Sequence, residues 1–405
     1  MKILFLPRWY PSKKDPMMGL FVKRHAEVAS SFADVFVLVV VADHTCFETE
    51  IVTTGKMVTL YYYYPSSKTA YQFINSIINQ LRWIYYLTKG LLQLKRKYGS
   101  IDIIHVNILT RLGIIAWIAK QLLGIPYVVT EHWSRYINGS FNGALRIWFT
   151  RLIIGGAAKV STVTLNLWES MRHYGLTNSN YIRLSNVVDT SLFKPSVLGF
   201  ESSVLLDKTL NQLYTDQQCY NPRRFIHVSC FEDRSKNISG LLRVLASLSS
   251  TTTDFECLLV GEGIDFERLK SYADRLGLKH PQVQFTGLLE GSKLVEAYCS
   301  ASFMVLFSNY ENMPVVIGEA FACGLPVIAT RTGGIAEYMA EWNGQMISIG
   351  DEAALSSSIL HFLYHADEFD RHHIRSYAEQ CFGTATVEKQ LKALYNIYSV
   401  NDVVV

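Results

Sequence analysis

Short runs of apolar, often β-branched residues alternate along the chain with longer stretches of helical period. Runs of this kind between helical segments are typical of buried parallel strands. In the first half, the strands we expect are Ile3–Leu6, Val35–Val41, Ile101–Val106, Tyr127–Thr130, Lys159–Val163 and Tyr181–Leu184. The helical stretches between them are Leu20–Ser31, Tyr71–Lys97, Arg111–Leu123 and Ala144–Ile154. This alternation predicts a doubly wound α/β sheet.

The pattern stops at residues 196–222, whose polar composition is typical of a linker. A second alternation follows, with expected strands at Phe225–Val228, Cys257–Val260, Val283–Phe285, Phe303–Phe307 and Val327–Ala329. A length of 405 residues suits two such domains. We expect a first domain over 1–190, joined by a C-terminal helix at about 385–405, and a second domain over 191–384.

Composition excludes several classes of protein. With 49% hydrophobic and 18% charged residues the chain can build packed cores, so it is not disordered or fibrous. Its seven cysteines contain no C-x-x-C pair, which argues against a disulfide framework or a zinc knuckle. The apolar run at Met1–Leu6 is too short for a signal peptide, and Val35–Ala42 is too short to span a bilayer. We expect a cytoplasmic protein, or one peripheral on the inner face of the cytoplasmic membrane.

The net charge of +3 hides an asymmetry between the two halves. Residues 51–168 hold 13 Lys or Arg against two acids, and residues 1–50 hold six of each sign, so the first 168 residues carry +11. The remainder must then carry −8. A basic half followed by an acidic half predicts two modules with different partners.

The most informative segment runs from Phe307 to Glu337. It places Glu311 and Glu319 eight residues apart, on either side of the turn Asn312-Met313-Pro314. Proline is favoured at a helix start and glycine after a helix end, so the helix should run from Pro314 to Cys323 before Gly324. Glu311 then lies in the loop and Glu319 inside the helix. The free N–H groups of the first turn of this helix suit a phosphate or a negatively polarised sugar oxygen.

This segment resembles the C-terminal fingerprint of retaining glycosyltransferases of family 4, also called glycosyl transferases group 1. The resemblance implies the GT-B fold, with two facing Rossmann-like domains and an interdomain cleft, the second domain binding a nucleotide-sugar. In the family's E-x7-E motif the first Glu, here Glu311, contacts the donor sugar. The second, here Glu319, binds the ribose, and the turn residues Asn312, Met313, Pro314 and Val315 lie along the donor.

Two positions in the first half extend the resemblance. Gly19 matches a glycine whose backbone lies beside the donor diphosphate, and a glycine lets the chain approach a phosphate closely. His132, in Thr130-Glu131-His132-Trp133, matches a histidine that contacts the donor sugar and shapes the acceptor site. A capping or core histidine is the alternative for His132.

One departure concerns the cations that should bind the diphosphate. Relatives place an Arg and a Lys after the first strand of the second domain. Here Lys236 is retained, but Cys230 stands where the Arg is expected and the loop is one residue longer. We hypothesise that Arg234 supplies the second charge, because a leaving diphosphate needs about two cations.

Two further segments follow strands of the second domain. Gly261-Glu262-Gly263 matches the family's tight turn under the nucleotide base, and Gly287-Leu288 matches the place where relatives hold the base by backbone contacts.

The resemblance implies an enzyme that moves a sugar from a UDP- or GDP-sugar to a hydroxyl of a glycan or lipid-linked acceptor, with retention of configuration. It implies no cofactor and no metal. Polysaccharide, lipopolysaccharide or glycolipid synthesis is the expected setting. The alternatives are a GT-B epimerase or phosphorylase, and a non-catalytic sugar-nucleotide-binding subunit.

The basic half combines aromatic residues with cations, as in the stretch from Tyr61 to Tyr98 and around Arg146 and Trp148. Such a mixture suits an anionic membrane surface or a lipid-linked acceptor. A packed aromatic core beneath a solvated basic face explains it equally well. No nucleic-acid partner is expected, because no motif of a known binding module is present.

Overall fold

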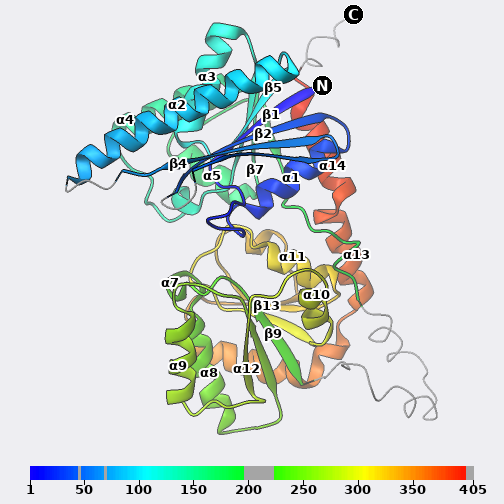
Figure 1. Cartoon of the computed structure of the whole chain (residues 1–405). Coiled ribbons are helices and arrows are strands. Elements are labelled where there is room, and N and C mark those ends of the chain that lie inside the picture. The colour runs from blue at the N-terminus through cyan, green and yellow to red at the C-terminus, as the bar shows by residue number, and fades with distance from the viewer. Residues whose placement is uncertain (44–46, 68–70, 196–222, 398–405) are drawn as a thin grey trace, which may run out of the picture. The chain divides into compact units, whose positions relative to one another are not determined.

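The computed structural model describes residues 1–43, 47–67, 71–195 and 223–397 (Figure 1). The chain divides into two compact units. Unit 1 comprises Met1–Val187 and the segment from Val387 onward, and unit 2 comprises Val188–Thr386. The expected linker at 196–222 lies outside the described residues.

Unit 1 is built on an eight-stranded sheet with the order β3-β4-β2-β1-β5-β6-β7-β8. All of its pairings are parallel except that of β3 with β4. The strands are β1 (Lys2–Pro7), β2 (Asp34–Asp43), β3 (Thr49–Thr54), β4 (Met57–Pro65), β5 (Ile103–Asn107), β6 (Tyr127–Glu131), β7 (Lys159–Thr162) and β8 (Tyr181–Arg183). The helices are α1 (Leu20–Ser30), α2 (Gln72–Tyr98), α3 (Thr110–Leu123), η1 (Ser134–Tyr136), α4 (Ala144–Gly156) and α5 (Leu165–His173).

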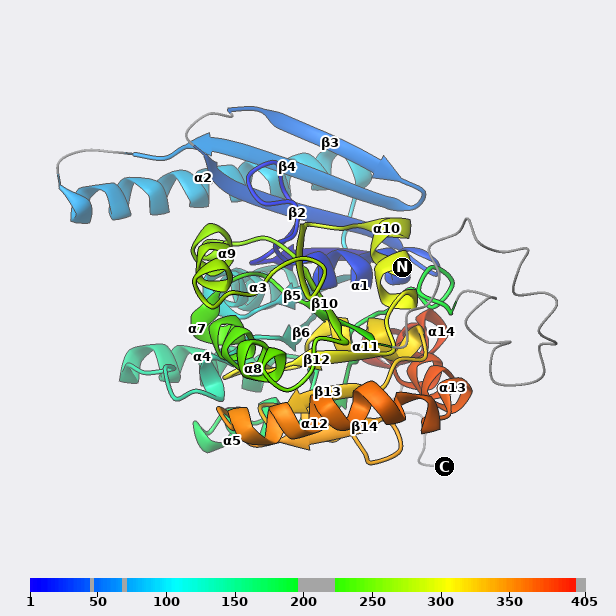
Figure 2. The ribbon, with the colours of Figure 1, turned by 90° about the horizontal axis from the view of Figure 1, so that it is seen from below.

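The hairpin of β3 and β4 is a feature that the apolar pattern did not predict. The tyrosine run lies in β4, where Tyr62, Tyr63 and Tyr64 are buried. The tyrosines of β4 therefore belong mainly to the packed interior of unit 1. Figure 2 shows α2 running along this edge of the sheet.

Unit 2 repeats the architecture with six parallel strands in the order β11-β10-β9-β12-β13-β14. The strands are β9 (Arg224–Val228), β10 (Glu256–Val260), β11 (Val283–Gly287), β12 (Phe303–Leu306), β13 (Val327–Thr330) and β14 (Gly344–Ile347). The helices are α7 (Asp233–Lys236), α8 (Ile238–Ser249), α9 (Phe266–Arg275), α10 (Gly291–Cys299), α11 (Val315–Ala322), α12 (Glu352–His365) and α13 (Arg371–Phe382). All the strands expected from apolar runs are confirmed, and β14 is an addition.

Each unit has its own apolar core. The core of unit 2 gathers buried residues of β9, β10 and β12 with those of α8 and α12. The core of unit 1 includes Val387, Leu391 and Leu394 of α14 (Thr384–Tyr395), so the last described helix packs on the first unit. Among the described residues, no helix has both the length and the apolar character needed to cross a membrane.

Candidate active site

An ion pair joins the carboxyl ends of β9 and β12, which are neighbours in the sheet of unit 2. Lys236 ends the short helix α7 after β9, and Glu311 lies in the loop after β12. Lys236 Nζ donates to Glu311 Oε1 at 2.6 Å, and Ser308 Oγ donates to the same oxygen at 2.8 Å. Adjacent parallel strands thus bring together two residues that are 75 positions apart in the sequence.

Hydrogen bonds donated by Asn309 hold the segment after β12 against the one after β9. The N–H of Asn309 donates to the carbonyl of Ser235 at 2.8 Å, and its side-chain amide donates to the carbonyl of Arg234 at 3.0 Å. Gly333, with φ of +56°, approaches so closely that an added Cβ would lie 1.9 Å from the Glu311 carbonyl oxygen. The position of Glu311 is therefore set by its neighbours on both sides.

The ion pair is electrostatically stable although Lys236 is largely buried. Burial lowers the pKa of Lys236, but the charge of Glu311 and its hydrogen bond raise it, and the net effect is an increase above the ordinary value. Lys236 therefore stays protonated at neutral pH. It offers a fixed cation at the carboxyl edge of the sheet, where ligands of open α/β sheets bind.

Helix α11 begins where the sequence predicted. Pro314 is its N-cap residue with φ of −69° and ψ of 124°, and Val315 is the first helical residue. Met313 is buried, whereas Asn312 is half-buried and its carbonyl accepts from the N–H of Gly334 at 2.9 Å. Glu311 thus lies before the helix and Glu319 lies inside it.

Glu319 is buried within unit 2, with 4% of its surface exposed. The hydroxyl of Tyr298, on α10, donates to its carboxylate at 3.4 Å. A carboxylate held in this way keeps a defined orientation and can accept further hydrogen bonds from a ligand hydroxyl.

The predicted glycine turn also brings two strand ends together. Gly261 has φ of +134°, and an added Cβ would lie 1.9 Å from the carbonyl oxygen of Ser229. Its N–H donates to the carbonyl of Gly287 at 2.9 Å, and Glu262 is exposed beside them. Only glycine fits at this point, because the backbones after β9 and β10 are in contact.

Arg234, in α7, and Cys230, in the loop before α7, are both exposed. The guanidinium of Arg234 is therefore open to solvent, while its carbonyl is fixed by Asn309. No group of three or more His, Cys, Asp or Glu side chains within the described ranges is arranged to hold a metal ion.

In unit 1, Gly19 is the N-cap residue of α1 and has φ of +74°. A Cβ at this position would lie 2.3 Å from the backbone of Trp9, so the loop after β1 closes tightly on the start of the helix. This closeness requires glycine, as the sequence predicted.

His132 directly follows β6 and has 8% of its surface exposed. Its ring lies 4.5 Å from that of Phe21 and 5.7 Å from that of His25, measured between centroids. Burial, and then the nearby His25 and His105, hold the pKa of His132 well below its ordinary value. The ring is therefore neutral at physiological pH and can exchange hydrogen bonds without carrying charge.

Glu131 is a residue whose importance sequence reasoning missed. Its fully buried carboxylate accepts from the N–H groups of Leu109, His132 and Trp133 at 2.9 to 3.1 Å and from the hydroxyl of Tyr136 at 3.4 Å. Burial raises its pKa, and these hydrogen bonds partly offset that effect. Glu131 thus positions the His132 backbone. The signal in the sequence that could have identified Glu131 was an acid directly after an expected strand, in a half of the chain that is otherwise basic.

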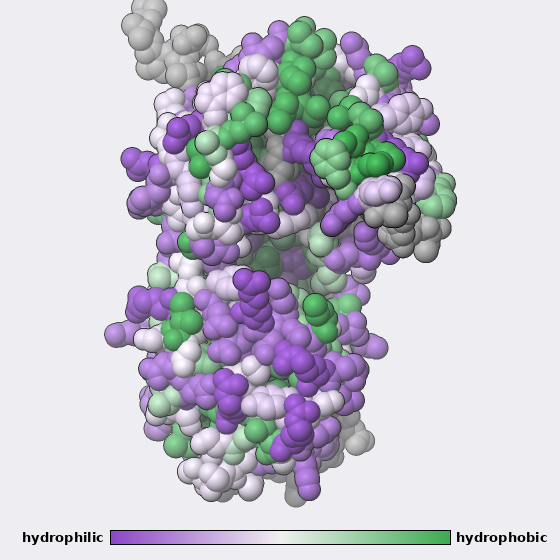
Figure 3. All heavy atoms as spheres, turned by 90° about the vertical axis from the view of Figure 1, so that its left-hand side faces the viewer, coloured by the Kyte–Doolittle hydropathy of each residue, from purple (hydrophilic) through white to green (hydrophobic). Residues whose placement is uncertain are grey.

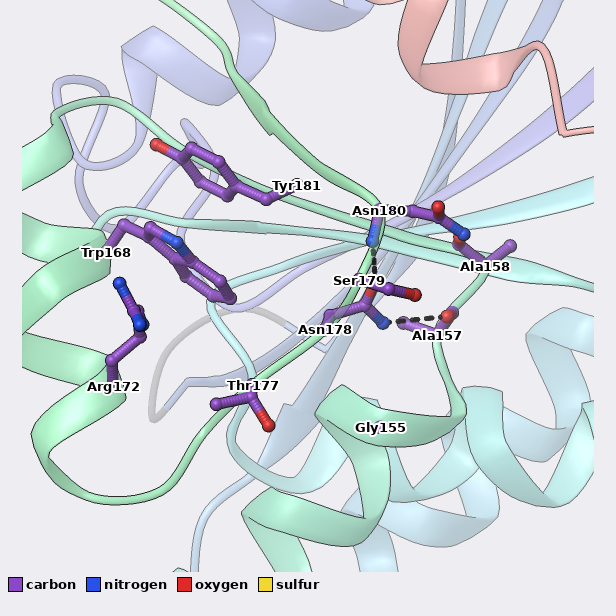
Figure 4. Close-up of a pocket in the computed structure, with 10 residues that line it drawn as sticks. All are labelled: Gly155, Ala157, Ala158, Trp168, Arg172, Thr177, Asn178, Ser179, Asn180 and Tyr181. Carbon is purple, nitrogen blue, oxygen red and sulfur yellow. Dashed lines mark hydrogen bonds between the residues drawn. The ribbon is translucent and has the colours of Figure 1, made fainter. Parts of the chain in front are cut away.

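A separate hollow of about 650 Å³ lies at the amino ends of β7 and β8 (Figure 4). Its Asn178 amide donates to the carbonyls of Ile154 and Ala157 at 2.8 and 3.0 Å, and Trp168 stacks on Tyr181. These polar groups close the end of α4. The hollow lies at the edge of the sheet opposite to His132, so it is not the candidate site.

Comparison with known protein families identifies the family of this chain. The model of the family described as Glycosyl transferases group 1 matches residues 220–380, and that of Glycosyltransferase Family 4 matches residues 42–192. The chain belongs to glycosyltransferase family 4.

This family 4 chain is 24% identical over 272 residues to N-acetyl-alpha-D-glucosaminyl L-malate synthase of Bacillus anthracis. The aligned region covers 65% of the chain and 66% of that protein. It is 27% identical over 251 residues to the sulfoquinovosyl transferase SQD2 of Arabidopsis thaliana. That aligned region covers 59% of the chain and 44% of the relative. The matches thus span at most 66% of the length of these two relatives.

Solved structures of similar fold cover nearly all of the family 4 chain. Sucrose-phosphate synthase from Thermosynechococcus elongatus superposes with a TM-score of 0.74 at 18% identity, over 97% of this chain and 98% of that one. HepE of Anabaena in complex with UDP superposes with a TM-score of 0.71 at 18% identity, over the same shares. The fold is therefore GT-B, with two Rossmann-like units.

Proposed function

We propose that the chain transfers a sugar, with retention of configuration, from a nucleotide-sugar donor to a hydroxyl of a glycan or lipid-linked acceptor. The observation that carries this proposal is the pair of Lys236 and Glu311 at the carboxyl edge of unit 2, directly before the start of α11. A fixed cation beside a carboxylate and free helix N–H groups suits a ligand that joins a phosphate to a sugar.

In this proposal the diphosphate lies at Lys236 and the first turn of α11, where the cation and the amides stabilise the leaving charge. Arg234 supplies a second charge when it folds over the donor. Protein cations therefore take the place that a resident metal would otherwise have. Gly261, Glu262 and Gly287 form the wall against which the nucleotide base rests.

Glu311 holds hydroxyls of the donor sugar, and Glu319 holds those of the ribose. The bond between the anomeric carbon and the diphosphate breaks, and the acceptor oxygen attacks from the same face. The acceptor proton passes to an oxygen of the leaving diphosphate, so no separate general base is needed. For unit 1 we propose that neutral His132 and the backbone beside Gly19 contribute to substrate binding.

The structure of HepE was determined in complexes with UDP and with UDP-glucose, which supports a nucleotide-sugar donor for a chain of this fold. Thermal-shift measurement with UDP-, GDP- and ADP-sugars tests this choice, because a ligand that binds only the native state raises its apparent stability. We expect one nucleotide class to raise the midpoint in the wild type and much less in Lys236→Gln. Equal shifts in both proteins contradict the proposed diphosphate site.

Product analysis then tests the reaction itself. Transfer to an acceptor releases nucleoside diphosphate in an acceptor-dependent manner, whereas an epimerase converts the donor without releasing it. Glu311→Gln should bind the nucleotide but lose transfer. A Glu311→Gln protein that restores a null strain supports a non-catalytic binding subunit instead.

We also propose that unit 1 contacts an anionic membrane surface through its outer helices. Phe73, Leu81 and Tyr85 on α2 are 77%, 61% and 60% exposed, and Leu145 and Trp148 on α4 are 70% and 56% exposed. Figure 3 shows apolar surface on unit 1 interspersed with hydrophilic surface. Apolar and cationic side chains on one surface suit the interface of a bilayer.

Flotation with vesicles containing phosphatidylglycerol tests this contact. We expect binding that weakens as salt rises, and less binding to neutral vesicles. A Phe73→Glu/Leu81→Glu variant should lose binding without losing fold, because both side chains are exposed. Absence of flotation at low salt contradicts the proposal.

A further inference from the structure

Four arginines gather at the carboxyl edge of the sheet in unit 1. Strands β1, β5 and β6 are consecutive neighbours in that sheet. Arg8 directly follows β1, Arg111 is the second residue of α3 after β5, and Arg135 lies in η1 after β6. Arg146 belongs to α4, which follows η1. We refer to these four residues as the arginine cluster. Because parallel strands end at one edge, the topology alone brings the first three together.

Aromatic rings lie against three of these guanidiniums, since the Cζ atom of Arg111 also lies 4.9 Å from the ring centroid of Trp83. The Cζ atoms of Arg8 and Arg135 lie 4.4 and 4.3 Å from the ring centroid of Trp133. Trp9 meets Trp133 edge-on at 6.2 Å. An arginine stacked on an indole keeps the N–H groups at the edge of its guanidinium available for a ligand. Stacking therefore orders the guanidinium without occupying its hydrogen-bond donors.

The other charges in this region do not neutralise the cluster. Glu131 is the acid whose charge acts on Arg8, and its carboxylate already accepts from three backbone N–H groups and the hydroxyl of Tyr136. In the part of the chain that the structure describes, none of the four arginines forms a salt bridge. Burial, followed by the charges of the other three members, lowers the pKa of Arg8. The charge of Glu131 acts in the opposite direction and offsets only part of this effect, so the cluster is a concentration of positive charge.

Like charges held together are unfavourable unless an anion binds them. We propose that the arginine cluster binds the phosphate or diphosphate group of the acceptor. A carboxylate would leave most of the cluster uncompensated, whereas a diphosphate offers several oxygens to guanidinium forks in bidentate geometry. This proposal deepens the proposed function and depends on it in one respect, namely that the anion belongs to the acceptor.

Calorimetric titration of the full chain with inorganic pyrophosphate tests the site. UDP and GDP are present at saturating concentration, so that the diphosphate site of unit 2 is filled. We expect the wild type to bind pyrophosphate and Arg8→Gln/Arg135→Gln to bind it at least tenfold more weakly. Arg172→Gln, which changes an exposed arginine on α5 outside the cluster, is the matched control and should bind like the wild type.

A second variant guards against a folding defect. Trp133→Phe keeps all four charges but removes the indole on which two of them stack. We expect it to weaken pyrophosphate binding severalfold, with a thermal midpoint close to that of the wild type. Pyrophosphate binding that is unchanged in both the double variant and Trp133→Phe overturns the proposal. Displacement of pyrophosphate from the cluster by UDP or GDP also overturns it, because the cluster then serves the donor.

Two further probes separate the sources of the phosphate. Farnesyl diphosphate binding more tightly than pyrophosphate supports a lipid-linked acceptor, and equal binding supports a soluble phosphorylated one. Galacturonate binding more tightly than either overturns the choice of phosphate. Thermal shifts with nucleotide-sugars should persist in Arg8→Gln/Arg135→Gln. Loss of pyrophosphate binding with retained donor binding therefore separates this site from the donor site of the proposed function.

Discussion

Units 1 and 2 share an architecture but differ in how they compensate charge at the carboxyl edges of their sheets. In unit 2 the cation Lys236 meets the carboxylate of Glu311 at 2.6 Å, and Arg268 meets Asp233 at 3.0 Å. In unit 1 the cations Arg8 and Arg135 meet the ring of Trp133. At the same edge of the same fold, Lys236 is therefore paired with a carboxylate in unit 2, whereas Arg8 and Arg135 lie against an aromatic ring in unit 1.

The difference follows from how each charge is used. A cation that is paired inside the protein is held in one place and can act on a ligand without reorganising, which suits a reaction centre. A cation stacked on an aromatic ring keeps its full charge and its donors, which suits capture of an anion. The net charges of +11 and −8 for residues 1–168 and 169–405 reflect this contrast.

The largest effect is expected from removing the paired cation of unit 2. Lys236→Gln deletes the charge at the proposed diphosphate site and leaves the buried Glu311 carboxylate without its ion-pair partner. We expect kcat/KM to fall about 100- to 1,000-fold, as when one preorganised donor is lost from an oxyanion site. Steady-state kinetics measures this, with Lys236→Arg, which keeps the charge, as the control. Unchanged turnover in Lys236→Gln contradicts the assigned role.

The second-largest effect is expected from acid, which should destabilise unit 1 more than unit 2. His25, His105 and His132 in unit 1 and His227 in unit 2 are buried with lowered pKa values, which are about 4 for His25 and His227. The unfolded chain takes up protons on these rings below about pH 6.5 while the folded chain does not, so stability falls as pH drops from 6.5 toward 4. For His25 alone, the resulting loss in the free energy of unfolding amounts to about 3 kcal/mol.

Unit 1 should therefore lose protection from hydrogen exchange at a higher pH than unit 2. Glu131 acts in the opposite sense, because its raised pKa lets the folded state hold a proton below that value, but three histidines outnumber it. Peptide-resolved exchange, corrected for its intrinsic pH dependence, measures the difference. Simultaneous loss of protection in both units contradicts it.

A substitution at Gly333 tests how firmly unit 2 holds its carboxylate. A Cβ there would lie 1.9 Å from the Glu311 carbonyl oxygen, so Gly333→Ala should lower the free energy of unfolding by about 2 kcal/mol and displace Glu311. Gly155 lies in helix α4, where an added Cβ meets open space. Gly155→Ala should therefore raise the free energy of unfolding by about 0.5 to 1 kcal/mol. Chemical denaturation measures both, and equal stabilities in the two variants count against the close approach.

The smallest expected effect concerns the exposed arginine of unit 2. Arg234→Ala should weaken donor binding about tenfold, equivalent to about 1.4 kcal/mol, because a solvated side chain must first be ordered over the ligand. Calorimetry with the preferred nucleotide-sugar measures this. Lys279→Ala, an exposed cation before the amino end of β11, should leave donor binding unchanged. If both variants bind the donor equally well, Arg234 does not replace the family arginine.

Part of the fold and of the site could be predicted from the apolar pattern. Buried parallel strands such as β10 and β12 are continuous apolar runs, and the helix start at Pro314 has a local signal. The hairpin was missed because β3 is mostly exposed and lacks an apolar run. Glu131 was underrated because its hydrogen bonds reach back to Leu109, 22 positions earlier.

By itself the sequence determined the alternation of strands and helices, the glycines at Gly19 and Gly261, and the spacing of Glu311 and Glu319. These features depend on local periodicity, backbone conformation and chain order, which neighbouring residues specify. Only the tertiary structure decided that Lys236 pairs with Glu311 and that Arg8 and Arg135 share Trp133. Those contacts exist because adjacent parallel strands end at one edge of a sheet, and strand adjacency arises from long-range packing rather than from local sequence.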